Sequence, residues 1–291
     1  MTQATALLFF LLLPAFVIYL SHHQAWARRL GVIVICYGIG MLSACGLQRH
    51  HLPQSGPGAT SGQVQGSRFL HKTVFMPGEG RSLHVYLEGD GRPWIHPRRV
   101  SLDPTPANPV MFSLFSLDDG PALYLGRPCY WQVEDAACEP KWWTSHRYAE
   151  AVVDSLDRAI DHYRGYVEIR LFGYSGGGSL AMLLAARRAD VTDLVTIAAN
   201  LDIAAWTALH GYSPLRGSLN PAEMDPLPGR IRQHHFAASA DKNVPPELIE
   251  TAAKKQANAV ITVVDGYNHA CCWETIWPEV LADIRARQPS F

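Results

Sequence analysis

The chain has 291 residues, which is long enough for one large domain with a substantial core. Hydrophobic residues make up 48% of it, charged residues 18%, and its formal net charge at pH 7 is -1. The 25 Lys and Arg residues are scattered along the sequence. Because nucleic-acid-binding proteins carry clustered basic residues, this composition excludes that class.

The N-terminal region has an unusual charge distribution. Residues 1–27 contain no Lys, Arg, Asp or Glu, and residues 4–20 form an apolar run of membrane length. The pair Arg28 and Arg29 then precedes a second apolar run, residues 30–41, which ends in Leu-Ser-Ala-Cys. A charged segment, a short apolar segment and small residues in this order are typical of a secretory signal.

The Leu-Ser-Ala-Cys ending resembles the lipobox of bacterial lipoproteins, which implies lipidation of Cys45. One hypothesis is that both apolar runs span the membrane as a hairpin, with the arginine pair in the cytoplasm. The alternative is that translation starts inside the first run, at Val17, and leaves an ordinary lipoprotein signal. Twelve apolar residues are short for a membrane span, which favours the lipoprotein. Both hypotheses predict a membrane-anchored protein on the extracytoplasmic, periplasmic face of a bacterial envelope.

The predicted domain organisation has three parts. Residues 1–45 are the membrane or signal region, and residues 46–67 are a flexible tether rich in Gly, Gln, Ser and Pro. His50 and His51 lie in this tether and are interpreted as solvated residues. Residues 68–291 are the expected catalytic domain.

In that domain, hydrophobic patterns predict strands and helices in alternation. A helix over residues 149–160, with Ser145 as its cap, lies among the strands, and further helices begin at Gly178 and Trp273. The alternation predicts an α/β fold with a mostly parallel central sheet, flanking helices and a small cap or none. Residues 200–230 are irregular and are expected to cover the site. The predicted strands are residues 81–87, 121–126 and 167–172, and segments of 191–202, 232–245 and 258–272.

Four cysteines fall in the expected domain. Cys129 and Cys138 lie close together in a loop-like segment, and the oxidising compartment expected for them favours a disulfide, worth roughly 2–3 kcal/mol. Neither cysteine pair has the spacing of a zinc site, so no metal is expected. Cys271 and Cys272 are compatible with pairing to each other, with pairing elsewhere, or with free thiols.

The segment Gly173-Tyr174-Ser175-Gly176-Gly177 carries the clearest chemical signal. It matches the G-x-S-x-G nucleophile elbow and stands where a predicted strand gives way to a helix. A serine hydroxyl is a poor nucleophile until a base removes its proton. The pattern therefore predicts Ser175 as a nucleophile exposed on a sharp turn.

This stretch resembles the α/β-hydrolase family, in which the nucleophile is followed along the chain by an acid and then a histidine. The resemblance covers roughly residues 83–287 and depends on three short motifs. It implies that His269 is the general base and that Asp241 orients it. Asp202 and Asp265 remain alternatives for the acid.

The resemblance also implies an oxyanion hole with two backbone donors. Gly176 is expected to supply one donor, and Asp90, with Gly91 directly after it, the other. Family members often have His-Gly at this loop, whereas this chain has Glu88-Gly89. A carboxylate beside an oxyanion is unfavourable, so the Asp90 side chain is expected to point elsewhere.

The sequence thus predicts a serine hydrolase that cleaves an acyl bond, most plausibly a carboxylic ester, through an acyl-enzyme. Thioesters and peptides rank below esters, and transfer of the acyl group to an alcohol is an alternative. So is a non-catalytic binding module on the same fold. The expected partner is a small-molecule or lipid acyl substrate, with no cofactor; the oligomeric state stays open. Five aromatic residues are candidates for either an acyl pocket or the core: Trp94, Tyr130, Trp131, Trp142 and Trp143.

Overall fold

The computed structural model describes residues 52, 58–96 and 98–286. The chain divides into two compact units, Met1–Arg49 and His50–Phe291, and all described residues belong to the second. Cys45 and the apolar runs lie outside the described residues, so their predicted roles stay predictions. Within the described ranges, no helix combines the length and apolar character needed to cross a membrane.

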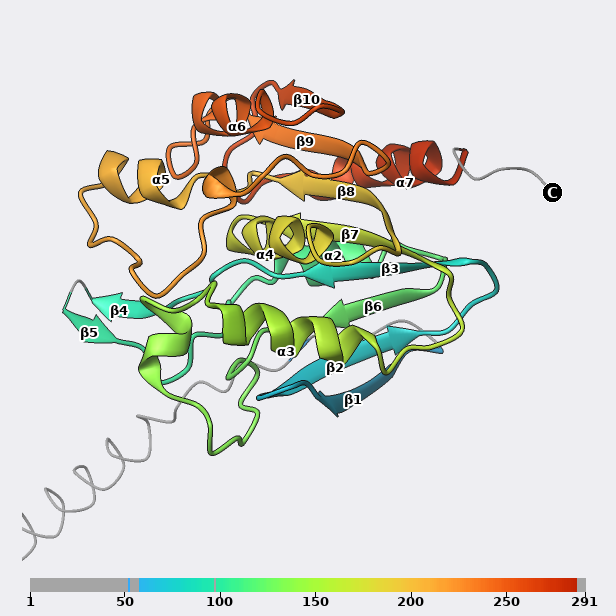
Figure 1. Ribbon diagram of the computed structural model, residues 1–291, viewed down its shortest axis with the longest axis horizontal. Coiled ribbons are helices and arrows are strands. Elements are labelled where there is room, and N and C mark those ends of the chain that lie inside the picture. The colour runs from blue at the N-terminus through green and yellow to red at the C-terminus, as the bar shows by residue number, and fades with distance from the viewer. Residues whose placement is uncertain (1–51, 53–57, 97, 287–291) are drawn as a thin grey trace, which may run out of the picture. The chain divides into compact units, whose positions relative to one another are not determined.

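An eight-stranded sheet forms the centre of this unit, in the order β1-β2-β6-β3-β7-β8-β9-β10 (Figure 1). Neighbouring strands are parallel from β6 to β10, whereas β2 pairs antiparallel with both β1 and β6. The predicted fold class is confirmed. The strands are β1 (Thr60–Gln65), β2 (Leu70–Met76), β3 (Ser82–Leu87), β6 (Ala122–Leu125), β7 (Glu168–Tyr174), β8 (Val191–Ile197), β9 (Arg232–Ala238) and β10 (Ala259–Val264).

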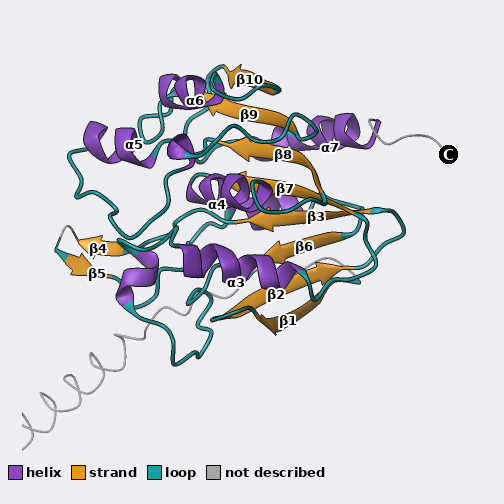
Figure 2. Ribbon diagram, in the orientation of Figure 1, coloured by secondary structure: helices purple, strands orange, loops and turns teal. Residues whose placement is uncertain are grey.

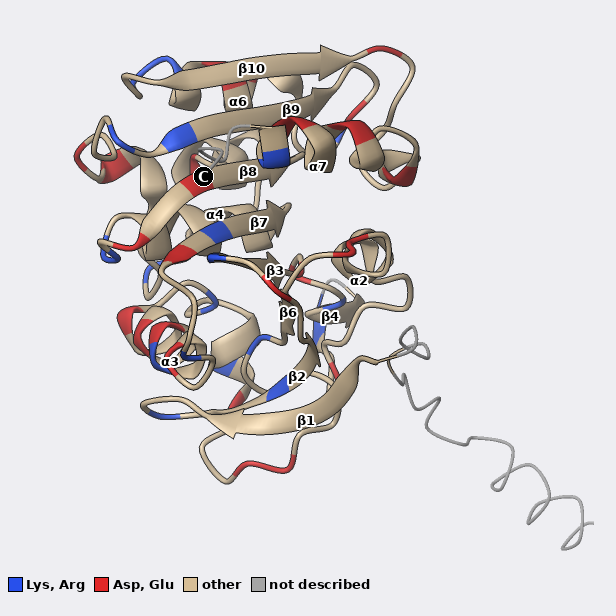
Figure 3. Ribbon diagram, turned by 90° about the vertical axis from the view of Figure 1, so that its right-hand side faces the viewer, with Lys and Arg blue, Asp and Glu red and all other residues tan. Residues whose placement is uncertain are grey.

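Helices cover both faces of the sheet (Figures 2 and 3). Figure 3 shows α3 and α4 on one face and α2 and α7 on the other. The helices are α2 (Val110–Phe115), α3 (Glu150–Ile160), α4 (Gly176–Ala185), α5 (Ile203–Leu209), α6 (Pro246–Ala253) and α7 (Trp277–Ala286), with 3-10 turns at Pro140–Trp143, Pro221–Glu223 and Trp273–Thr275.

The core sits around the central strands. All six residues of β3 and all ten of α4 are buried, as expected for elements covered on every side. On the α7 side, the rings of Tyr86, Phe172 and Trp277 meet edge to face, with centroids 4.8 to 6.0 Å apart. This packing fixes β7, the strand that leads into the elbow, between two helix layers.

The predicted tether is too long at its C-terminal end. Residues Thr60–Gln65 form β1, paired in register with β2 from Thr60–Phe75 to Gln65–Leu70. Five of the six β1 residues are exposed, so this edge strand has no apolar pattern that could identify it. The folded unit therefore begins before residue 68.

Two predicted helix limits also differ. Ser145 does not cap α3: its hydroxyl contacts Nδ1 of His146, and Ala149 is the residue before the helix. The expected C-terminal helix is divided into a 3-10 turn, Trp273–Thr275, and α7.

Ion pairs fasten α3 to the end of α4. Figure 3 shows acidic positions along α3. Arg187 pairs with Glu150 and Asp154, and Arg188 pairs with Asp157 at 2.5 Å. These contacts join the helix that follows Ser175 to its neighbour on the same face.

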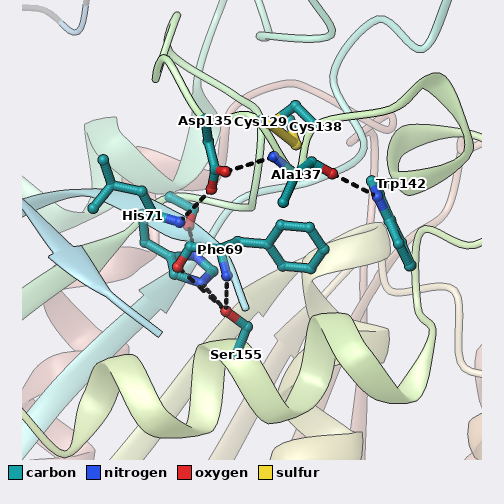
Figure 4. Close-up of a disulfide and its surroundings, with 10 residues drawn as sticks. Phe69, His71, Cys129, Asp135, Ala137, Cys138, Trp142 and Ser155 are labelled. Carbon is teal, nitrogen blue, oxygen red and sulfur yellow. Dashed lines mark hydrogen bonds between the residues drawn. A yellow bond between two sulfur atoms is a disulfide. The ribbon is translucent and has the colours of Figure 1, made fainter. Parts of the chain in front are cut away.

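The predicted disulfide between Cys129 and Cys138 is present, with Cα atoms 5.6 Å apart (Figure 4). Asp135 inside this loop accepts hydrogen bonds from the backbone N–H groups of Leu70 and Ala137. The loop is thereby attached to the start of β2.

The segments that border the site lie beyond the carboxyl ends of the parallel strands. Figure 1 shows α5 and the small hairpin of β4 (Trp94–His96) and β5 (Arg99–Val100) on this side of the sheet. In sheets of this kind, the carboxyl ends of the strands are where ligands bind.

Candidate functional site

Ser175 occupies a sharp turn between β7 and α4. Its backbone has φ 52° and ψ -122°, a region that a non-glycine residue rarely adopts. The turn is held by the Ser175 N–H, which donates to the carbonyl of Ile197 on β8 at 2.9 Å. The surrounding structure therefore imposes this conformation on the serine.

The glycines around Ser175 have a steric cause. A Cβ atom on Gly173 would overlap the carbonyl oxygen of Gly177, and one on Gly177 would overlap the carbonyl oxygen of Leu87. The strand, the turn and the helix thus approach one another too closely for side chains. This is the arrangement that the G-x-S-x-G pattern predicts.

Three predicted site residues come together at the carboxyl end of the sheet. Nε2 of His269 lies 3.1 Å from Oγ of Ser175, and Nδ1 of His269 lies 2.7 Å from Oδ2 of Asp241. The Asp241 side chain is fully buried, and that of His269 is 22% exposed. The three side chains form one hydrogen-bonded chain from a buried carboxylate to a hydroxyl at the surface of a cleft.

Asp241 is held by its own loop. Its Oδ1 accepts the backbone N–H groups of Asn243 and Val244, which leaves Oδ2 for His269. The alternatives for the acid lie elsewhere: Asp202 caps α5 through Ala205 N–H, and Asp265 accepts the hydroxyl of Ser239. Among the described residues, neither of these two carboxylates is bonded to His269.

Asn243 is a site residue that sequence reasoning missed. Its side-chain Nδ2 lies 3.0 Å from Nε2 of His269, the nitrogen that also faces Ser175. The ring of Tyr174 lies 5.1 Å from the His269 ring, centroid to centroid. Asparagine is common in loops, and only its position two residues after Asp241 could have indicated a role.

The Asp90 side chain lies in a charge cluster directly beside Gly176, where a Cβ on the glycine would overlap Oδ1 of Asp90. Oδ1 accepts from Arg127 at 2.6 Å, and Oδ2 accepts from Arg147 at 2.8 Å and from the Tyr148 hydroxyl at 2.6 Å. The Tyr130 hydroxyl donates to the Asp90 carbonyl. Burial alone would raise the pKa of Asp90, but the two guanidiniums and the Tyr148 hydroxyl lower it to about 2.

These bonds leave the backbone of the Asp90 loop facing the cleft. Asp90 and Gly91 both line it. Within the described residues, the backbone N–H groups of Asp90 and Gly176 donate to no protein acceptor. Gly91 has φ 60°, and a Cβ there would overlap the carbonyl of Pro104, so this position of the loop requires glycine.

Glu88 stands where the resembled family often has histidine. The carboxylate is buried and accepts the backbone N–H groups of Gly89 and Met111. Burial raises its pKa to about 7, and these backbone bonds offset only part of that effect. Glu88 therefore fixes the loop before Asp90 and carries a proton over part of the neutral range.

A cleft of about 1190 Å³ opens above Ser175 and His269. One wall comes from residues 88–96, and the opposite wall from Trp206 and residues 211–215. The segment expected to cover the site thus lines it. Of the aromatic candidates only Trp94 borders the cleft, whereas Tyr130, Trp131, Trp142 and Trp143 are buried in the core.

The sequence left the pairing of Cys271 and Cys272 open. Cys271 and Cys272 are paired with each other, two and three residues after His269. In the part of the chain that the structure describes, His, Cys, Asp and Glu side chains form no group of three that could hold a metal ion.

No protein-family model matches the chain, and no curated protein matches it in sequence. Solved structures do match its fold. A putative hydrolase from Agrobacterium vitis S4 has a TM-score of 0.57 at 15% identity, covering 78% of this chain and 98% of that one.

Two other matches have similar extents. The esterase from Exiguobacterium antarcticum has a TM-score of 0.56 at 11% identity and covers 78% of this chain and 100% of its own. A serine hydrolase without a lid from Xanthomonas campestris has a TM-score of 0.53 at 13% identity, with 82% and 99% covered. The chain therefore has the α/β-hydrolase fold.

Proposed function

We propose that this protein is a serine hydrolase that cleaves an acyl bond, with a carboxylic ester as the leading substrate class. The observation that carries the proposal is the hydrogen-bonded chain from Asp241 through His269 to Ser175. It stands at a strained elbow that opens into a cleft. The hydrolase and esterase names of proteins with the same fold are consistent with it.

In the proposed mechanism, Nε2 of His269 takes the proton from Ser175 Oγ as this oxygen attacks the acyl carbon. The buried Asp241 carboxylate accepts a hydrogen bond from the Nδ1–H of His269, fixes the tautomer and stabilises the imidazolium. His269 then returns the proton to the leaving oxygen, and an acyl group remains on Ser175. Water activated by His269 releases the acid.

The negative charge that develops on the acyl oxygen needs preorganised donors. We assign the backbone N–H groups of Gly176 and Asp90 to this role, with Gly91 adjacent. The Asp90 carboxylate lies beside Gly176, and its ion pairs with Arg127 and Arg147 offset its negative charge there. The cluster carries one more positive than negative charge, which further favours an anionic transition state.

The test is labelling of the full chain with a fluorophosphonate, followed by peptide mass spectrometry. We expect one adduct, on Ser175, which is lost in Ser175→Ala and in His269→Ala. His162→Ala is the matched control, because His162 is exposed and bonded to the carbonyl of Gln65 far from the cleft. A folded protein without an adduct on Ser175 would contradict the mechanism and favour the non-catalytic binding module.

Substrate class is tested separately with the labelling-competent chain. Esters of increasing acyl length, the matching thioesters and peptides are compared by kcat/KM, and we expect the esters to have the highest values. Acyl transfer to an alcohol is scored in the same assay as ester product formed in competition with acid. A peptide turned over faster than every ester would overturn the ester assignment.

Location is also a proposal, supported by the sequence before residue 46. We propose that the protein is anchored to the membrane by its N-terminal segment or by a lipid on Cys45. The mass of the intact native protein tests this, since a diacylated N-terminal cysteine and an uncleaved first apolar run differ in mass.

A further inference from the structure

We infer that the β4–β5 hairpin is a docking surface for a bilayer rich in anionic phospholipid. The hairpin surface is defined as residues 91–96 and 98–102, with the apolar side chains of Trp94, Ile95 and Leu102 and the arginines Arg92, Arg98 and Arg99. The proposal concerns lipid binding and does not depend on the hydrolase mechanism.

The apolar side chains of this surface are unusually exposed. Trp94 is 44% exposed, Ile95 43% and Leu102 81%. On the other side of the cleft, α5 and the turn after it expose Leu209 and Tyr212 by 56% and 54%. Exposed apolar groups gathered at one place mark an interaction site, whereas single ones need no explanation.

The charges on the same surface have one sign. Arg92, Arg98 and Arg99 are exposed, and within the described residues none of them forms an ion pair with a carboxylate. Residues 91–102 contain no Asp or Glu, and neither do residues 209–217, which include Arg216. Elsewhere in the described unit, six arginines that pair with acids are Arg127, Arg147, Arg187, Arg188, Arg232 and Arg285. The exposed Arg68, Arg164 and Arg230 have no carboxylate partner within 4 Å among the described residues, but they are far apart in the sequence and are not grouped with exposed apolar residues as the hairpin arginines are.

This combination fits a lipid headgroup layer better than a protein partner. Tryptophan and arginine are also enriched in protein interfaces, so the assignment depends on the charge of the hairpin, which has three arginines and no Asp or Glu in residues 91–102. Tryptophan favours the membrane interface, and arginine extends its apolar stem along lipid while its guanidinium reaches phosphates. Unpaired arginines are complementary to an anionic leaflet.

The lipid-binding hairpin also forms part of the wall of the cleft. Arg92, Trp94 and Ile95 belong both to this surface and to the wall of the cleft above Ser175. A bilayer in contact with the hairpin therefore lies beside the mouth of the cleft, where a lipid acyl chain can enter without crossing water.

Trp94 itself is a probe of this contact. The other described tryptophans, Trp131, Trp142, Trp143, Trp206, Trp273 and Trp277, are at least nine-tenths buried. The full chain carrying Trp26→Phe is reconstituted into vesicles with brominated acyl chains, which quench only those indole rings that touch lipid. Phosphatidylcholine vesicles are compared with vesicles containing one third phosphatidylglycerol.

We expect quenching in the anionic vesicles to fall when Trp94 is replaced by Phe, and to fall to the same level in Arg92→Gln/Arg98→Gln/Arg99→Gln. The matched control, Arg68→Gln/Arg164→Gln/Arg230→Gln, removes the same charge from exposed arginines outside the hairpin and keeps the quenching. About 1 M salt, where the Debye length is about 3 Å, lowers the Trp94 contribution. Cooperative thermal unfolding of every variant shows that it is folded.

Equal quenching of the Trp94→Phe chain and its parent in anionic vesicles overturns the proposal. So does a Trp94 contribution that is the same in neutral and anionic vesicles. If lipid leaves Trp94 unquenched while rising protein concentration shields it from acrylamide, the surface binds a second copy of the chain, and the lipid assignment is wrong.

Discussion

The side-chain amide of Asn243 and the hydroxyl of Ser175 meet the same nitrogen of His269, at 3.0 and 3.1 Å. Only one lone pair is available on a neutral imidazole whose other nitrogen donates to Asp241. The amide N–H and the serine O–H therefore compete for it. In the proposed mechanism, Asn243 competes with Ser175 for the His269 lone pair in the resting site.

Replacing Asn243 by Ala is expected to accelerate fluorophosphonate labelling of Ser175 about fivefold, because a hydrogen bond of about 1 kcal/mol no longer competes for the lone pair. Second-order labelling rates measure this. Asn108→Ala is the control, since Asn108 is exposed and lines the same cleft without contacting His269. An unchanged or slower rate in Asn243→Ala would mean that the amide does not compete.

Asp241→Asn is expected to lower kcat/KM about 10⁴-fold, because the amide at this position no longer selects the tautomer with a free lone pair on Nε2. Asp202→Asn serves as the comparison, since Asp202 caps α5 and asparagine caps equally well, so neither stability nor rate should change much. Steady-state kinetics on one ester substrate distinguishes the two. Equal losses in both variants would remove Asp241 from its assigned role.

Gly177→Ala is expected to destabilise the fold by about 3 kcal/mol, because the new Cβ overlaps the carbonyl of Leu87 and neither backbone can move without the other. Gly62→Ala is the matched change: its Cβ meets only Thr73 Oγ1, at 3.6 Å. Its effect should stay within about 1 kcal/mol. Denaturant unfolding of both variants gives the comparison, and similar midpoints would refute the steric account of the elbow.

Glu88 is expected to make the fold less stable as pH rises. The folded chain keeps the Glu88 proton up to about pH 7, whereas the unfolded chain releases it near pH 4.5. Between these values the unfolded state binds fewer protons, so the free energy of unfolding falls with rising pH, by about 3 kcal/mol in all.

Glu88→Gln cannot titrate, so its free energy of unfolding is expected to lack this dependence on pH. It is also expected to be lower by a constant amount, because one amide oxygen replaces the two carboxylate oxygens that accept hydrogen bonds. Buried His71 and His235, whose pKa burial lowers to about 4, destabilise the fold in the opposite direction, as pH falls below 6.5. The difference in unfolding free energy between Glu88→Gln and its parent, measured from pH 4.5 to 8, isolates the Glu88 effect. A pH-independent difference would contradict it.

The strands that lead to the site could be predicted because they are buried. β3 is buried at every residue, and β7 and β8 are almost entirely so, which leaves mostly apolar segments in the sequence, interrupted by His84, Arg170 and Asp193. The elements that the sequence did not indicate include buried ones, since β2 is partly buried and α2 is buried at five of its six residues. The missed strands β1 and β4, by contrast, are exposed over most or all of their length. Their strand character comes from pairing with a neighbour, which a one-dimensional pattern does not record.

Site residues that follow a strand could be predicted from the sequence, whereas those in irregular segments could not. Ser175, Asp241 and His269 each follow a recognisable strand, so their convergence could be expected although Ser175 and His269 are 94 residues apart. Arg127 and Arg147 stand 37 and 57 residues from Asp90, in irregular segments. Sequence reasoning expected the Asp90 carboxylate to point elsewhere, whereas it lies beside Gly176, and nothing local indicated which cations would pair with it.

The Asp90 cluster also restricts how this protein can vary. Replacing Asp90 alone leaves two buried guanidiniums without a carboxylate, and replacing either arginine removes one of the two cations that neutralise Asp90. Each single replacement therefore destabilises the fold, whereas replacing all three residues together by apolar ones need not do so. Across relatives of this chain, positions 90, 127 and 147 are therefore expected to change together, as one inherited unit spread over three distant parts of the sequence.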